Sequence, residues 1–83
     1  MRLRTDGVTW QEIDGELVIL DLKTSAYLTT NVAGGQLAKL LVDERTFDEL
    51  AACLVDRFGV DQEAAQADAE AFVAQLRAKD LLD

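Results

Sequence analysis

A short stretch near the amino end, residues 16–31 (ELVILDLKTSAYLTTN), places the strongest constraint on the fold. Residues 17–20 form an apolar, β-branched-rich run that is too short for a helix and is bounded by turn residues, which predicts a buried strand. Residues 26–30 also favour β structure but are only half apolar, and Asn31 then ends the run by capping a helix. Because the segment 26–30 is the last strand and is polar on one side, we expect it at the edge of a sheet.

An edge strand has unpaired backbone N–H and C=O groups, and an extended peptide can satisfy them by adding one more strand. The commoner meaning of a short, partly polar edge is protection of the sheet against aggregation. Both interpretations are open at this point.

The remaining strand signals lie on either side of two turns. Residues 8–13 have the mixed, alternating pattern of a first strand. Asp14-Gly15 follows, and this pair between β-rich runs predicts a type I′ hairpin, because that turn needs positive φ at both central residues. Residues 23–25 are a second polar connection, after which residues 26–30 can fold back as the third strand of a meander.

Three helices are expected after the strands, each with its own capping signal. Their predicted bounds and caps are residues 32 to about 42 (Asn31), residues 47–58 (Thr46 with Glu49, then Gly59) and residues 62 to about 79 (Asp61). Leu81 and Leu82 are expected to fold back after the third helix. The sequence therefore predicts one α+β domain over residues 1–83, a three-stranded antiparallel sheet followed by three helices.

Small residues at two places raise the question of close packing. Gly34-Gly35 lies in the first turns of the first helix, where each glycine costs about 1 kcal/mol relative to alanine. Either the helix approaches the sheet closely or its start is frayed. The apolar stripe of the third helix begins with Ala65 and Ala69, which leave either a tight helix contact or a shallow groove.

Composition limits the possible functions. A chain of 83 residues can bury one modest core but not a deep catalytic cavity as well. With 16 acidic and 8 basic residues the net charge is −8, which repels nucleic acid and anionic lipid and favours a basic or neutral partner. Histidine is absent and Cys53 is the one cysteine, so we expect neither an enzyme nor a metal or cofactor site, and we expect Cys53 to be a packing residue. No membrane-length run or signal sequence is present, so the cytoplasm is the expected compartment.

The order and spacing of these motifs resemble the PqqD-like family, the recognition elements that bind leader segments of ribosomally synthesised and post-translationally modified peptides. The resemblance covers about residues 6 to 82. One departure is at Lys79-Asp80, where the family usually has a glycine before the closing leucines. The matching residues are Asp14-Gly15-Glu16-Leu17-Val18-Ile19-Leu20-Asp21, Tyr27 to Asn31 leading into Gly34, Thr46-x-x-Glu49-Leu50, Asp68-x-x-x-Phe72-x-x-x-Leu76 and Leu81-Leu82.

The resemblance implies a winged helix-turn-helix fold that does not bind DNA. It also implies that a leader peptide lies as an extra antiparallel strand along the third strand, in the groove between that strand and the third helix. Leu20 and Leu76 fit a core position at least as well as a peptide pocket, and Phe72 fits either. The residues that the resemblance implies in peptide binding are Ala26, Tyr27, Leu28, Thr29 and Thr30 on the strand, and Ala65, Asp68, Ala69, Phe72 and Leu76 on the helix. The alternation of side chains along an added strand makes Leu20 a further candidate pocket residue.

Within the family, the chain looks most like the stand-alone leader-binding protein of lasso peptide biosynthesis. In that setting the leader has a Tyr-x-x-Pro-x-Leu core, and the implied partners are a separate cysteine leader peptidase and an asparagine-synthetase-like cyclase. Three alternatives are a PqqD-type peptide chaperone that works with a radical SAM enzyme, a structural dimerisation module and a DNA-binding winged helix. The last is disfavoured because its recognition helix would begin with Asp61-Gln62-Glu63.

Overall fold

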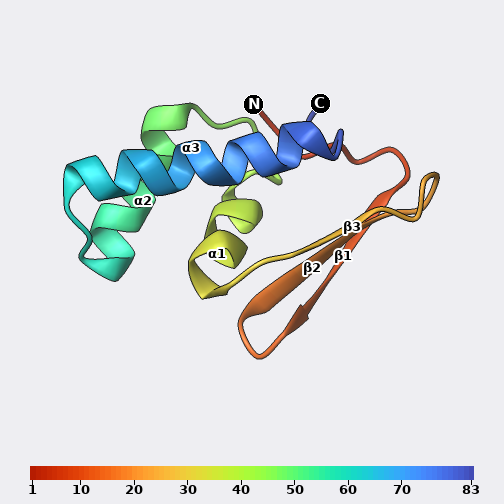
Figure 1. Ribbon diagram of the computed structural model, residues 1–83, viewed down its shortest axis with the longest axis horizontal. Helices are drawn as coiled ribbons and strands as arrows, with labels where there is room; N and C mark the ends of the chain where they lie inside the picture. Colours follow the sequence, from red (N-terminus) through yellow and green to blue (C-terminus); the bar gives the residue numbers. More distant parts are fainter.

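The computed structural model, which describes residues 1–83, is a three-stranded antiparallel sheet followed by three helices (Figure 1). The elements are β1 (Val8–Ile13), β2 (Glu16–Asp21), β3 (Tyr27–Thr29), α1 (Val32–Leu40), α2 (Phe47–Phe58) and α3 (Gln62–Ala78). The sheet order is β1-β2-β3, so β2 is central and β3 is an edge strand. This confirms the predicted α+β fold class and the predicted meander.

Two predicted bounds differ from the structure. The third strand has three residues instead of five, although its flanking residues still bond to β2. The first helix ends at Leu40 and not near residue 42. The reason is that Leu41 turns into the core, where it is fully buried, and its carbonyl accepts a hydrogen bond from the N–H of Leu3 at 2.8 Å. The amino-terminal segment thus bonds to a carbonyl at the end of α1 that has no partner within the helix.

The predicted turns have the expected backbone geometry. In the hairpin between β1 and β2, Asp14 has φ 54° and Gly15 has φ 84°, which is the positive pair that a type I′ turn requires. At the carboxyl end, Asp80 has φ 55° and takes a left-handed conformation directly before the closing leucines. Aspartate tolerates this region better than most residues, so the turn forms without glycine.

All three predicted helix starts are capped as expected. Asn31 Oδ1 accepts from the N–H of Gly34 at 2.8 Å, and Asp61 Oδ1 accepts from the N–H of Ala64 at 2.8 Å. At α2, Thr46 and Glu49 form both bonds of the capping box. None of the helices is both long and apolar enough to span a membrane.

The Gly34-Gly35 pair allows α1 to approach the sheet closely. A Cβ added at Gly35 would lie 3.0 Å from the backbone oxygen of Gly15 in the β1–β2 turn. A Cβ added at Gly34 would lie 3.3 Å from Cε1 of Phe72. Both glycines are buried within the helix, so the close-approach interpretation is confirmed and the frayed-start interpretation is not.

The core lies between the helices and one face of the sheet. Leu17, Ile19 and Asp21 of β2 are buried, while the intervening residues are more exposed, as the period of two predicts. α1 packs on β2, and α3 packs mainly on α2. Consequently β3 has a close neighbour on only one side.

A buried ion pair fixes the connection into β3. Arg4 Nη2 lies 2.6 Å from Asp21 Oδ2, and Asp21 is only 2 % exposed. The backbone N–H of Lys23 donates to Asp21 Oδ1 at 2.9 Å, and this bond together with Arg4 holds the pKa of Asp21 below its ordinary value. The amino-terminal segment is thereby attached to the turn from which β3 starts.

Candidate functional site

The outer edge of β3 has free backbone hydrogen-bonding groups. The N–H of Thr30 donates to the carbonyl of Leu17 at 2.8 Å, and the N–H of Asp21 donates to the carbonyl of Ala26 at 2.8 Å. Hydrogen-bonded pairs alternate along an antiparallel ladder, so Leu28, midway between these two positions, directs its own groups toward β2. The N–H and C=O groups of Tyr27 and Thr29 therefore point away from the sheet.

The side chain of Thr30 closes the β2–β3 ladder. Its Oγ1 accepts from the N–H of Leu17 at 2.9 Å and donates to the carbonyl of Leu17 at 3.0 Å. Thr30 is buried, so these two bonds are shielded from water. The hydroxyl takes the place of a backbone group just where the chain leaves the sheet for α1, and this keeps the end of β3 in register.

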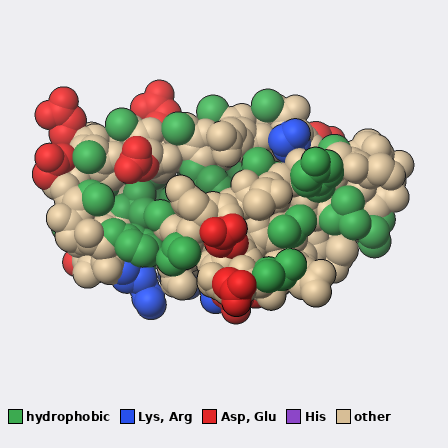
Figure 2. Space-filling view, turned by 60° about the horizontal axis from the view of Figure 1, so that its bottom comes forward, with side chains coloured by type: hydrophobic (Ala, Val, Ile, Leu, Met, Phe, Trp, Pro, Cys, Tyr) green, Lys and Arg blue, Asp and Glu red, His purple; other side chains and the backbone are tan.

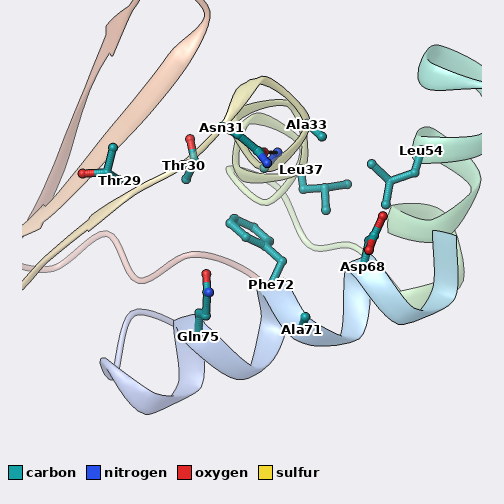
Figure 3. Close-up of a pocket in the computed structure, with 11 residues that line it drawn as sticks. Thr29, Thr30, Asn31, Ala33, Leu37, Leu54, Asp68, Ala71, Phe72 and Gln75 are labelled. Carbon is teal, nitrogen blue, oxygen red and sulfur yellow. Dashed lines mark hydrogen bonds between the residues drawn. The ribbon is translucent and has the colours of Figure 1, made fainter. Parts of the chain in front are cut away.

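A groove of about 300 Å³ runs beside this edge, between the β3–α1 junction and α3 (Figure 3). Its α3 wall is made by residues three and four apart, which share one face of a helix. The residues that line it are Thr29, Thr30, Asn31, Ala33, Gly34, Leu37, Leu54, Asp68, Ala71, Phe72 and Gln75. Five of these are apolar, so the groove offers a ligand both apolar and polar contacts.

Phe72 forms the centre of the groove. Its side chain points from α3 toward the junction of β3 with α1 (Figure 3), and it is 8 % exposed. The ring fits there because Gly34 has no side chain; a Cβ at that position would be 3.3 Å from the ring. Gly34 and Phe72 together therefore determine the depth of the groove.

Comparison with known proteins identifies the family. The model of one protein family, described as coenzyme PQQ synthesis protein D (PqqD), matches residues 16–82. The chain belongs to the PqqD family. The predicted resemblance to PqqD-like recognition elements is thereby confirmed.

Two solved structures share this PqqD fold. One is "TbiB1 in Complex with the TbiA(beta) Leader Peptide", with 28 % identity, a TM-score of 0.88, and coverage of 100 % of this chain and 95 % of that chain. The other is "Lasso peptide synthetase B1 complexed with the leader peptide", with 24 % identity, a TM-score of 0.81, and coverage of 96 % and 93 %. The second, at this identity, supports the fold alone. No curated protein matches the chain.

The structure brings four of the predicted binding residues together in the groove of this PqqD-family protein: Thr29, Thr30, Asp68 and Phe72. Ala26 and Tyr27 do not line the groove but lie on the same strand edge, and the side chain of Tyr27 is exposed. Leu28 is nearly buried, facing the core.

Four other predicted residues lie away from the groove. Ala65, Ala69 and Leu76 have no exposed surface, so they are core residues that a peptide cannot reach in this structure. Leu20 is half-buried on the opposite face of the sheet, where it lines a shallow depression with Trp10. Ala65 and Ala69 therefore make tight packing and not a groove.

The sequence interpretation missed all of the groove lining on α1 and two residues on α3. Ala71 and Gln75 lie at intervals of three and seven from Asp68, which is a helical face next to the apolar stripe. That periodicity was available in the sequence. No sequence signal identified Leu54 of α2, because its contribution depends on how α2 packs against α3.

Proposed function

We propose that this protein binds the leader segment of a ribosomally made precursor peptide. The leader adds as an antiparallel strand to the open edge of β3, and its inward side chains enter the groove beside Phe72. The single observation that supports this most is that the backbone groups of Tyr27 and Thr29 face outward from the open edge of β3, where Thr29 also lines the groove. Family membership and the similarity to TbiB1, which was solved in complex with a leader peptide, support the same function.

The magnitudes favour moderate affinity. Two outward residues offer up to four backbone hydrogen bonds, each worth about 0.5–1.5 kcal/mol net. Burial of apolar leader side chains in the groove adds to this, while ordering a disordered leader costs about 2–5 kcal/mol. We expect a Kd on the order of 10⁻⁸ to 10⁻⁶ M.

The protein acts in this proposal as a non-catalytic adaptor. It holds the precursor by its leader and presents it to a separate cysteine leader peptidase, and then to an asparagine-synthetase-like cyclase, in lasso peptide biosynthesis.

The family description favours a second candidate, a peptide chaperone that works with a radical SAM enzyme in the synthesis of pyrroloquinoline quinone or another modified peptide. Titration with leaders of both kinds distinguishes them, because the cognate leader binds at least tenfold more tightly.

Amide hydrogen exchange tests the added strand directly. In the free protein, the amide of Leu28 is bonded to β2 and should exchange slowly, whereas the amides of Tyr27 and Thr29 face outward and should exchange fast. A saturating leader-like peptide with a Tyr-x-x-Pro-x-Leu core should slow exchange at Tyr27 and Thr29 and leave Leu28 nearly unchanged. Uniform protection of all three amides, or none, contradicts strand addition at this edge.

A substitution at Ala71 tests the groove. Phe72 is a poor target because a charge placed there would be buried and would destabilise the fold. Ala71 is exposed and lines the groove, so Ala71→Gln should obstruct it and weaken binding of the peptide by about tenfold or more. Ala74→Gln is the matched control, because Ala74 is an exposed residue of the same helix that does not line the groove. Fluorescence anisotropy gives both affinities, and equal effects would place the site elsewhere.

A further inference from the structure

We infer that the groove selects a leader with a lysine or arginine on the amino-terminal side of its strand-forming residues, and that Asp68 is the residue that makes this selection. The inference rests on the proposed function and specifies the peptide chemistry that the site accepts. It starts from the position of Asp68, which is the one charged residue among those that line the groove.

Asp68 has no cation of its own. The structure has seven ion pairs, which use about half of the charged side chains, and none of them involves Asp68. The basic residue in the last turn of α3, Arg77, is nine positions further along the helix, which is about 13 Å at 1.5 Å per residue. Acidic side chains are also spread over the face shown in Figure 2, with few basic ones among them.

The walls around Asp68 suit a long aliphatic side chain that ends in a cation. Leu37 and Leu54 are buried residues that line the same part of the groove, on the side opposite to Gln75 and the strand (Figure 3). Lysine and arginine place their methylene groups against apolar surface and their charge at a polar end. The amino end of α1 adds roughly half a positive charge nearby, which offsets only part of the full negative charge of Asp68.

The direction of the bound peptide determines on which side the cation lies. β3 runs toward α1, so a peptide antiparallel to it has its amino-terminal residues beyond Thr30, toward Asp68. Asp68 and Gln75 are seven positions apart on α3, about 10 Å along the helix axis. An extended peptide covers this distance in about three residues. The basic residue is therefore expected about two to four positions before the residue that lies beside Gln75.

The experiment uses synthetic peptides with the Tyr-x-x-Pro-x-Leu core and a single lysine, glutamine or glutamate placed in turn at each flanking position. At one amino-terminal position the lysine peptide should bind about three- to tenfold more tightly than the glutamate peptide at low salt. Asp68→Asn should reduce this ratio to below about twofold, and about 0.5 M salt should reduce it in the unmodified protein. Anisotropy titration measures each affinity.

Glu70→Gln is the matched control. It changes the net charge from −8 to −7, as Asp68→Asn does, but Glu70 is exposed on a different face of α3 and does not line the groove. The lysine preference should therefore persist in Glu70→Gln. A preference that persists in Asp68→Asn, or lies on the carboxyl-terminal side of the core, overturns the inference while leaving peptide binding intact. If the glutamine peptides fail to bind at all, the proposed function itself is wrong and the inference fails with it.

Discussion

Replacing Thr30 by valine removes a hydroxyl and keeps the shape of the side chain, so it isolates the hydrogen bonds at the end of β3. In the structure Oγ1 accepts from the N–H of Leu17 at 2.9 Å, and Thr30 is only 6 % exposed. Thr30→Val leaves that N–H buried without a partner, whereas the carbonyl of Leu17 keeps its bond from the Thr30 backbone. An unsatisfied buried donor costs about 1–3 kcal/mol. We expect the free energy of unfolding to fall by that amount.

Urea denaturation and thermal melting measure this loss. For a domain of this size each kcal/mol corresponds to roughly 4–8 °C in Tm. Thr30→Ser is the informative control because it keeps the hydroxyl and loses one methyl group, which is worth about 0.8 kcal/mol when buried. Thr29→Val changes an exposed neighbour and should alter stability by less than about 0.5 kcal/mol. If Thr30→Val proves as stable as Thr30→Ser, the hydroxyl does not hold the ladder and the reasoning is refuted.

Two further predictions concern contacts that position the elements around the groove. Gly35→Ala gains about 1 kcal/mol of helix propensity, but its new Cβ would lie 3.0 Å from the Gly15 backbone oxygen. We therefore expect the free energy of unfolding, measured in urea, to fall by about 1 kcal/mol net. A more stable variant would refute the close contact. The pKa of Asp21 is lowered in the folded protein, mainly by the N–H of Lys23 and also by Arg4, so its carboxylate stabilises the fold above its ordinary pKa of 3.8. That contribution is lost as the pH falls below about 4 through the folded pKa. In this range the unfolding midpoint should therefore depend less on pH for Asp21→Asn than for the unmodified protein. If the midpoints of the two proteins change with pH in the same way, the Asp21 carboxylate does not have this role.

Residues that act through local backbone chemistry were predictable from the sequence. Asp14-Gly15 specifies its own turn because few residues adopt positive φ, and the Thr46 and Glu49 pair specifies a helix start within four residues. The edge position of β3 followed from the order of strands and from the helix that Asn31 caps. In each of these cases the interacting atoms are only a few residues apart in the chain.

The binding residues on α3 were less predictable because a helical stripe does not tell which of two neighbouring faces meets the core. The stripe that includes Ala65, Ala69, Phe72 and Leu76 was expected to face the peptide in part, and only Phe72 of these lines the groove. The face that contains Ala71 and Gln75 is open because α3 packs on α2 and leaves β3 uncovered. The orientation of α3 depends on contacts between elements distant in sequence.

The sequence by itself determined the elements, their order, their caps and the acidic charge, since each of these depends on local geometry or on composition. Only the tertiary structure decided that Thr30 serves the sheet instead of facing outward and that Gly34 makes room for Phe72. It also decided that Leu54 contributes to the groove. The physical reason is that a groove is the space left between packed elements, and its lining is fixed by how those elements pack together.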